Sequence, residues 1–310
     1  MNTSTSFNRI AAFIVFLLAF TTLLTGSVWL WQKAAGSTSL SSKIPVVAAE
    51  NVWGNIAEQL GGNLVHVTSI IHDPSADPHL YESDPNDSAA VASAKVVIVN
   101  GLGYDDFAQK LLAANPNTNR TTLVIGDVLE ISGANANPHL WYNLPRIPEV
   151  ARAITTSYET QDPAHTAYYE AQLATFTSSL APSMSLISQI ATQFPQAHVA
   201  YTERVSGYLL SAVNASVKTP ESFAQAIEDG NDPTPADTLT MQTLLSSHAI
   251  RALIYNTQAS TPVTQQLQDV ANKNGISVVS VTEMLPTNEP TYQSWQQHQL
   301  QALQQALNHD

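Results

Sequence analysis

Two halves of this sequence repeat the same alternation of strand-like and helix-like segments, and this alternation limits the possible fold more than any other feature. The strand-like runs are 44–49, 65–71 and 95–100 in the first half and 197–202, 252–256 and 277–281 in the second. Helix-like segments lie between them, at 50–60, 84–94, after Ser206 and at 263–274, and a last one covers 291–307. The run at 95–100, KVVIVN, is continuously apolar, as strands buried on both faces of a parallel sheet are. The pattern predicts an α/β fold with two βα-layered lobes.

A long stretch without glycine separates the two halves. Apolar residues recur there at helical spacing, from Tyr169 to Ile190, and only Pro182 interrupts the pattern and should bend or loosen the helix. A helix of this length would extend past one small lobe, so we expect one long helix to bridge the two lobes. The expected domains are a signal or anchor at 1–36, a linker at 37–43, an N-terminal lobe at 44–164, the connecting helix at 165–194 and a C-terminal lobe at 195–310.

Composition excludes several kinds of function. The net charge of -13 with only 12% charged residues leaves no basic stripe for phosphates, so nucleic acid is not an expected partner. The absence of cysteine excludes disulfides, thiolate metal sites, a cysteine nucleophile and a lipid on an N-terminal cysteine. Any bound metal must therefore have nitrogen and oxygen ligands.

The N-terminal segment predicts export. Arg9 precedes a largely apolar run at 10–31, which is followed by Lys33 and a Gly/Ser/Thr-rich stretch. This run is longer than the usual signal core of ~7–15 residues and close to the ~20 residues that span a bilayer. Both a cleaved signal peptide and an uncleaved membrane anchor fit. In either case we expect the rest of the chain in the periplasm or on the outer face of the cytoplasmic membrane.

Two histidine motifs of the same form indicate a metal site. They are Asp77-Pro78-His79 and Asn137-Pro138-His139, and the first lies on a loop after a predicted strand. Each proline stiffens the loop that presents the histidine. A single histidine of this kind could equally be an ordinary hydrogen-bonded residue and not a metal ligand. The repetition of X-Pro-His favours a pair of ligands.

Two glutamates just after predicted strands of the second half complete the candidate site. Glu203 follows the strand that ends at 202, and Glu283 follows the strand that ends at 281. Ligands of parallel α/β sheets bind beyond the carboxyl ends of strands. We therefore predict a metal site in the cleft between the lobes, with His79, His139, Glu203 and Glu283 as ligands. Either glutamate alone could equally be a solvated residue or a helix cap.

The remaining histidines are predicted to be surface or packing residues, and His72 is the exception. His72 lies in the first histidine loop and could support a ligand or serve as an entry group. The others are His66, His165, His198, His248, His298 and His309.

Several separate motifs give the chain a family resemblance from about residue 44 to its C-terminus. They are AAENVWGNIAEQLGG at 48–62, DPHLYE at 77–82, VVIVNGLGYDDF at 96–107, NPHLWYN at 137–143, ERVSGYLL at 203–210 and VTEMLP at 281–286. The sequence resembles the substrate-binding proteins of zinc and manganese ABC importers, the periplasmic solute-binding protein family 9. The resemblance implies two α/β lobes bridged by one long rigid helix, capture of a metal for an ABC permease, and no enzymatic activity. A monomer is expected.

The resemblance also bears on each ligand and on the metal. His79 and His139 match the two first-lobe histidine ligands of the family. Glu203 resembles a position that is histidine in many zinc-binding members and glutamate in many manganese-binding ones, and Glu283 stands where the family usually has aspartate. The histidine-rich loop of many zinc importers is absent. We therefore expect Mn²⁺ as cargo rather than Zn²⁺, with Fe²⁺ also possible, although zinc binds such nitrogen and oxygen ligands more tightly than manganese.

Two other functions remain as alternatives. Two histidines and two carboxylates could hold a metal that activates water in a hydrolase. The sequence has no HExxH helix, GxSxG motif or phosphate-binding glycine loop, and four protein ligands would fill a shell that catalysis needs partly open. The second alternative is a surface adhesin of the same fold, which a cell-binding assay with and without the metal site would distinguish from a transport protein.

Overall fold

A four-stranded parallel sheet forms the centre of the first half of the chain in the computed structural model, which describes residues 43–73 and 81–309. Its strand order is β2-β1-β3-β4. The strands are β1 (Ile44–Glu50), β2 (Val65–Ile71), β3 (Val96–Val99) and β4 (Thr121–Val124). β1 pairs in parallel with both β2 and β3, and β3 pairs in parallel with β4. The carboxyl ends of these strands therefore meet at one edge of the sheet.

Helices cover both faces of this first sheet. They are α2 (Asn51–Gly61), α3 (Pro85–Ser93), α4 (Asp106–Ala114), the short α5 (Ile125–Val128) and α6 (Ile147–Gln161). Alternate residues of β1 face two different cores: Val46 and Ala48 pack with α2 and α6, whereas Val47 and Ala49 pack with α3 and α4. This two-sided burial explains why β3 and residues 44–49 of β1 are apolar throughout.

A second parallel sheet has the same arrangement in the second half. Its strand order is β6-β5-β7-β8. The strands are β5 (His198–Tyr201), β6 (Ser216–Val217), β7 (Ala252–Asn256) and β8 (Ser277–Val281), and the helices are α9 (Gly207–Ala212), α10 (Glu221–Glu228), α11 (Pro235–Ser246), α12 (Pro262–Lys273) and α13 (Tyr292–Asn308). Thr261 and Thr291 begin α12 and α13 with capping boxes, which satisfy amides at the first turn. The predicted α/β fold with two βα lobes is confirmed.

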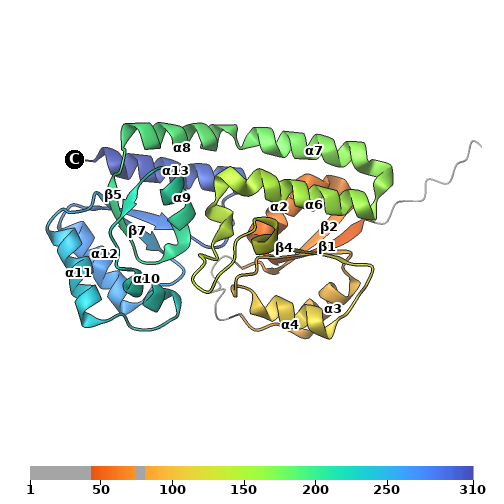
Figure 1. Ribbon diagram of the computed structural model, residues 1–310, viewed down its shortest axis with the longest axis horizontal. Helices are drawn as coiled ribbons and strands as arrows, with labels where there is room; N and C mark the ends of the chain where they lie inside the picture. The colour runs from red at the N-terminus through yellow and green to blue at the C-terminus, as the bar shows by residue number, and fades with distance from the viewer. Residues whose placement is uncertain (1–42, 74–80, 310) are drawn as a thin grey trace, which may run out of the picture. The chain divides into compact units, whose positions relative to one another are not determined.

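Two consecutive helices connect the halves. They are α7 (Thr166–Ser179) and α8 (Ala181–Gln193), which follow one another along the same side of both sheets (Figure 1). α7 packs against α6, and α8 packs against α13. The helical connector was expected to loosen at Pro182, and the break lies at Leu180, just before it. Proline fits the first turn of α8 because no intrahelical partner is needed for its missing N–H there.

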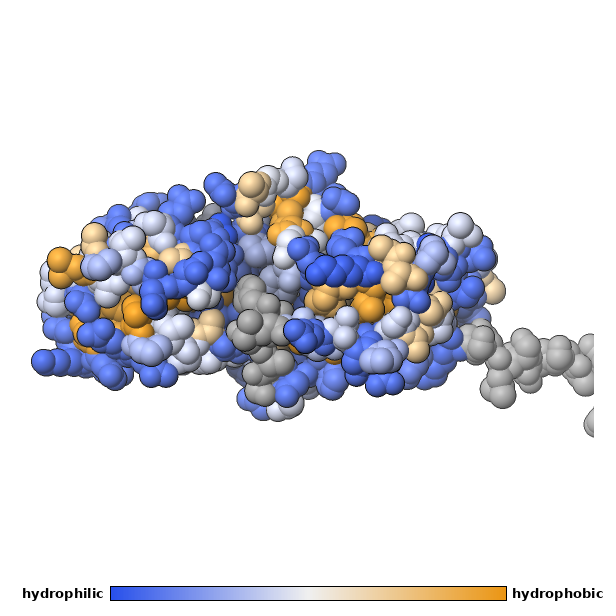
Figure 2. All heavy atoms as spheres, turned by 90° about the horizontal axis from the view of Figure 1, so that it is seen from below, coloured by the Kyte–Doolittle hydropathy of each residue, from blue (hydrophilic) through white to orange (hydrophobic). Residues whose placement is uncertain are grey.

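One large core joins the two halves. It contains apolar residues of β1, β3, β5 and β7 together with residues of the connecting helices and α13. Hydrophilic residues cover most of the face shown in Figure 2, and among the residues that the structure describes Leu239 is the one large hydrophobic side chain classed as exposed, at 63%. No helix within 43–73 or 81–309 has the length and apolar character to cross a membrane. The predicted signal or anchor lies outside the described residues.

Candidate metal centre

His139 is held in one defined orientation by Asn137. Its side chain is fully buried, and its Nδ1 lies 2.7 Å from Asn137 Oδ1. The backbone N–H of His139 also donates to this atom at 3.0 Å, which identifies it as the amide oxygen. Because an oxygen of this kind only accepts, Nδ1 must carry the hydrogen, and a neutral ring then presents a lone pair at Nε2. Metal-binding histidines are oriented in this way.

Nε2 of His139 faces a carboxylate of the other half. It lies 3.5 Å from Oε2 of Glu283 and makes no hydrogen bond to any residue that the structure describes. Two acceptors at this distance in a buried place attract a cation or a proton between them. This is the geometry expected of two ligands of one metal ion.

Residues of the first sheet fix the loop that carries His139. Asn100, which follows β3, donates from Nδ2 to the carbonyl oxygen of Pro138 at 2.8 Å. The carboxylate of Asp105 accepts the backbone N–H groups of Asn100 at 2.5 Å and Gly101 at 2.8 Å. Burial raises the pKa of Asp105 to about 6, although these two N–H groups act in the opposite direction. The loop is therefore tied to the carboxyl end of β3.

The same loop is tied to the second half. Asn137 donates from Nδ2 to the carbonyl oxygen of Arg204 at 2.7 Å, and the hydroxyl of Tyr208 donates to the carbonyl oxygen of Asn137 at 2.9 Å. A Cβ atom on Gly207 would lie 2.7 Å from Asn137 Nδ2, so a larger residue would not fit without movement. The guanidinium of Arg204 makes two 2.8 Å bonds to Glu228. These contacts bring residue 203 close to the His139 loop.

The two predicted carboxylate ligands share one amide. Glu203 and Glu283 are 3% and 1% exposed. Asn256, the last residue of β7, donates from Nδ2 to Glu203 Oε2 at 2.5 Å and to Glu283 Oε1 at 2.8 Å. The hydroxyl of Tyr104 donates to Glu283 Oε2 at 2.7 Å. Burial, followed by the charge of Glu283, raises the pKa of Tyr104 well above its ordinary value, so this hydroxyl stays protonated.

The loop of Glu283 is also fixed from within the second half. Oε1 of Gln258 accepts the backbone N–H groups of Glu283 and of Met284, the latter at 3.0 Å. The hydroxyl of Tyr142, in the His139 segment, donates to the carbonyl oxygen of Thr282 at 2.7 Å. Glu283 therefore has a defined backbone position next to His139.

The structure brings three of the four predicted ligands together and does not reach the fourth. His139, Glu203 and Glu283 converge through the contacts above, and His79 lies outside the described residues. Within 43–73 and 81–309, no three His, Cys, Asp or Glu side chains are arranged to hold a metal ion.

Glu50 is a buried carboxyl group that the sequence did not indicate as a site residue. It is the last residue of β1 and is fully buried, and neither of its oxygens has a hydrogen-bond partner in the described part of the chain. Burial, followed by the charge of Asp105, raises its pKa well above the ordinary value. The only signal in the sequence was its place directly after an apolar strand. The orienting roles of Asn137, Asn256 and Tyr104 were not predicted either, because neutral amides and a phenol hydroxyl are not typical metal ligands.

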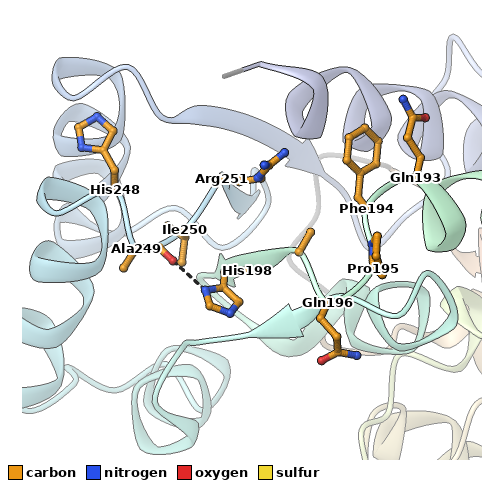
Figure 3. Close-up of a pocket in the computed structure, with 10 residues that line it drawn as sticks. Gln193, Phe194, Pro195, Gln196, His198, His248, Ala249, Ile250 and Arg251 are labelled. Carbon is orange, nitrogen blue, oxygen red and sulfur yellow. Dashed lines mark hydrogen bonds between the residues drawn. The ribbon is translucent and has the colours of Figure 1, made fainter.

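The other histidines of the described residues are mostly exposed. His72 is exposed, and its Nδ1 lies 3.0 Å from the carbonyl oxygen of Ile70 in its own strand end. His165 is half-buried next to Asp162, and the remaining five are exposed. His198 and His248 line a surface pocket of about 390 Å³ with Arg251 (Figure 3). This pocket lies where β5 begins, whereas Glu203 follows the end of β5, so the pocket is separate from the candidate site.

Comparisons with known proteins agree with the fold. A family model described as zinc-uptake complex component A, periplasmic (ZnuA), matches residues 46–306. The manganese ABC transporter substrate-binding lipoprotein PsaA of Streptococcus pneumoniae is 28% identical over 176 residues, which is 53% of this chain and 56% of PsaA. The iron ABC transporter substrate-binding lipoprotein MtsA of Streptococcus pyogenes serotype M1 is 26% identical over 155 residues, 46% of this chain and 50% of MtsA. The chain thus matches about half the length of these relatives.

A solved structure covers more of the chain. The periplasmic zinc binding protein TroA from Treponema pallidum has a TM-score of 0.72 and 17% identity over 86% of this chain and 99% of TroA. At this identity the likeness concerns the fold. The matching family consists of substrate-binding proteins of transporters, so the expectation of no enzymatic activity is confirmed. Through the match over 46–306, this chain belongs to the family of the zinc-uptake complex component A, periplasmic.

Proposed function

We propose that this protein is a substrate-binding protein outside the cytoplasm that captures one divalent transition metal ion and delivers it to an ABC permease. The metal is bound by His79, His139, Glu203 and Glu283. The observation that carries the proposal is the position of His139 Nε2, which is buried and lies 3.5 Å from Glu283 Oε2. Because Nδ1 donates its hydrogen to Asn137, Nε2 of the neutral ring carries the lone pair that can bind a metal. Family membership supports the same conclusion.

The donor set favours manganese over zinc as the cargo. Two of the four ligands are carboxylates, which are hard donors and can bind through one or both oxygens. Such a site suits the higher coordination of Mn²⁺, whereas structural Zn²⁺ prefers four ligands in a tetrahedron. Relatives named for manganese, iron and zinc all occur, so the metal of this protein has to be measured.

The remaining parts of the proposal concern the chain as a whole. The lobes comprise residues 44–164 and 195–310, and 165–194 connects them. Segment 1–36 directs export and can anchor the protein, so that the site faces the periplasm or the outer surface of the cytoplasmic membrane. The protein acts as a monomer, and its partner is the permease.

Metal titration of single ligand variants tests this proposal. Competition with a fluorescent chelator gives the Kd of the wild type and of the alanine variants of His79, His139, Glu203 and Glu283. Each substitution should weaken binding of Mn²⁺ by at least about 10-fold, because each removes a direct ligand. His198→Ala is the matched control, since His198 is exposed at the opposite end of β5. Affinity that is unchanged in His139→Ala would remove the site.

A further inference from the structure

Helix α2 of the first half presents a row of amide side chains to the second half. The row consists of Asn51, Asn55 and Gln59, spaced four residues apart and hence on one side of the helix. We call it the amide row. Asn51 donates from Nδ2 to the carbonyl oxygen of Leu285 at 2.9 Å, and the N–H of Leu285 donates to Asn51 Oδ1 at 2.9 Å. One amide thus binds both polar groups of a single backbone unit.

The rest of the amide row follows the chain from Leu285 into α13. The N–H of Tyr292 donates to Asn55 Oδ1 at 2.8 Å, and Asn55 Nδ2 donates to the carbonyl oxygen of Pro290 at 3.3 Å. The side-chain amides of Gln59 and Gln293 pair at 3.0 Å. Three successive turns of α2 therefore bind residues 285–293.

The amide row joins parts of the chain that belong to different sheets. α2 packs on β1 and β2 of the first sheet, whereas the segment it binds follows β8 of the second. Leu285 is two residues after Glu283, and Gln258 of the second half holds the backbone N–H of Glu283. The backbone of the Glu283 loop is therefore held at residue 283 by Gln258 of the second half and at residue 285 by Asn51 of the first half. The bonds of the amide row use no ligand atom, so a metal ion is not needed to make them.

We propose that the amide row is a positioning device that holds Glu283 next to His139 and thereby determines how tightly the metal is bound. This inference rests on the proposed function, in which Glu283 is a ligand. A ligand that is already in place loses little conformational freedom when the ion arrives, whereas a mobile one must be ordered at the expense of affinity. The contribution of each amide should fall with its distance along the chain from Glu283, in the order Asn51, Asn55, Gln59.

The test compares Asn51→Ala and Gln59→Ala with the wild-type full-length protein in detergent. Asn115→Ala is the matched control, since Asn115 is also half-buried and its amide also makes two hydrogen bonds, to Ser88 and Leu111. Without these two hydrogen bonds, we expect Glu283 to be in its binding position only about one-tenth of the time before the ion arrives, which raises the Kd for Mn²⁺ about 10-fold. Gln59→Ala should have a smaller effect and Asn115→Ala none. Hydrogen exchange at Leu285 should become faster in Asn51→Ala alone.

Several outcomes would overturn the inference. Wild-type affinity in Asn51→Ala, together with faster exchange at Leu285, would show that the bond exists but does not serve the metal. Equal effects of Asn51→Ala and Asn115→Ala would indicate a general loss of stability. If Asn51→Ala does not fold, Asn51→Asp keeps the acceptor for Leu285 N–H and loses the donor, and it should weaken binding less than about 10-fold but measurably. Wild-type affinity in that variant would also overturn the inference.

Failure of the proposed function would look different. In that case Glu283→Ala and His139→Ala would both bind Mn²⁺ as the wild type does. If only Glu283→Ala binds normally while Asn51→Ala does not, the amide row does not act through Glu283 and this inference is wrong, although the metal site survives. Loss of binding in both ligand variants with normal binding in Asn51→Ala would refute the amide row alone.

Discussion

Substitution of Asn137 by alanine should lower metal affinity without touching a ligand. The change removes the acceptor that holds His139 Nδ1 at 2.7 Å and the donor that binds the carbonyl oxygen of Arg204 at 2.7 Å. Loss of such a supporting group typically lowers metal affinity 10- to 100-fold, which corresponds to about 1.4–2.8 kcal/mol. We expect the Kd of Asn137→Ala to rise within this range, because His139 would then be free to rotate and to expose N–H instead of the lone pair.

Competition titration with a chelator measures this effect, and two further variants separate its causes. Asn137→Asp keeps an acceptor for both N–H groups of His139 and loses only the bond to Arg204, so its affinity should stay within a few-fold of the wild type. Asn115→Ala, at the end of α4 and also half-buried, should leave the affinity unchanged. A folded Asn137→Ala protein with wild-type affinity would refute the argument that Asn137 orients the ligand.

Three shorter predictions concern the surroundings of the site. The folded wild type binds an extra proton at Asp105 between pH 3.8 and about 6, so its free energy of unfolding should fall by about 3 kcal/mol as the pH rises through this window. Asp105→Asn removes this titration, so its free energy of unfolding should change less with pH. Urea unfolding of both proteins at pH 4 and pH 7 measures the difference. Arg204→Ala should lower the free energy of unfolding by about 1.5–3 kcal/mol, since it leaves the partly buried charge of Glu228 unpaired; urea unfolding that gives less than 1 kcal/mol would contradict this. Tyr104→Phe should weaken Mn²⁺ binding about 10-fold, because the hydroxyl orients Glu283. This loss should be the same at pH 6 and pH 9, since the raised pKa of Tyr104 keeps the hydroxyl protonated, and a loss that varies with pH would count against this role.

Six of the eight strands in the described residues could be predicted, and burial on both faces gives β1, β3 and β7 nearly uninterrupted apolar runs. Strands β1, β2, β3, β5, β7 and β8 lie at the predicted positions to within two residues at each end. The edge strands β4 and β6 were not predicted. β4 (Thr121–Val124) begins with two threonines and has no fully buried residue, and β6 (Ser216–Val217) has two residues, so neither has the apolar run of a central strand. Edge position alone does not explain this, because the edge strands β2 and β8 were predicted.

The convergence of His139, Glu203 and Glu283 could be predicted because each follows or lies near the carboxyl end of a parallel strand. The groups that orient them could not. Asn137 is recognisable only from its bonds to His139 and Arg204, and Asn256 only from its two carboxylate partners. Neutral amides are common on every surface, and their role depends on contacts between residues that are far apart in the sequence.

The amount and identity of bound metal test the central claim most directly. Mass spectrometry should determine the metal content of the purified wild type, His139→Ala and Glu203→His after expression with Mn, Zn and Fe supplied together. We predict close to one equivalent of manganese in the wild type, a shift toward zinc in Glu203→His, and almost no metal in His139→Ala. No metal in the wild type, or an unchanged content in His139→Ala, would contradict the proposed site.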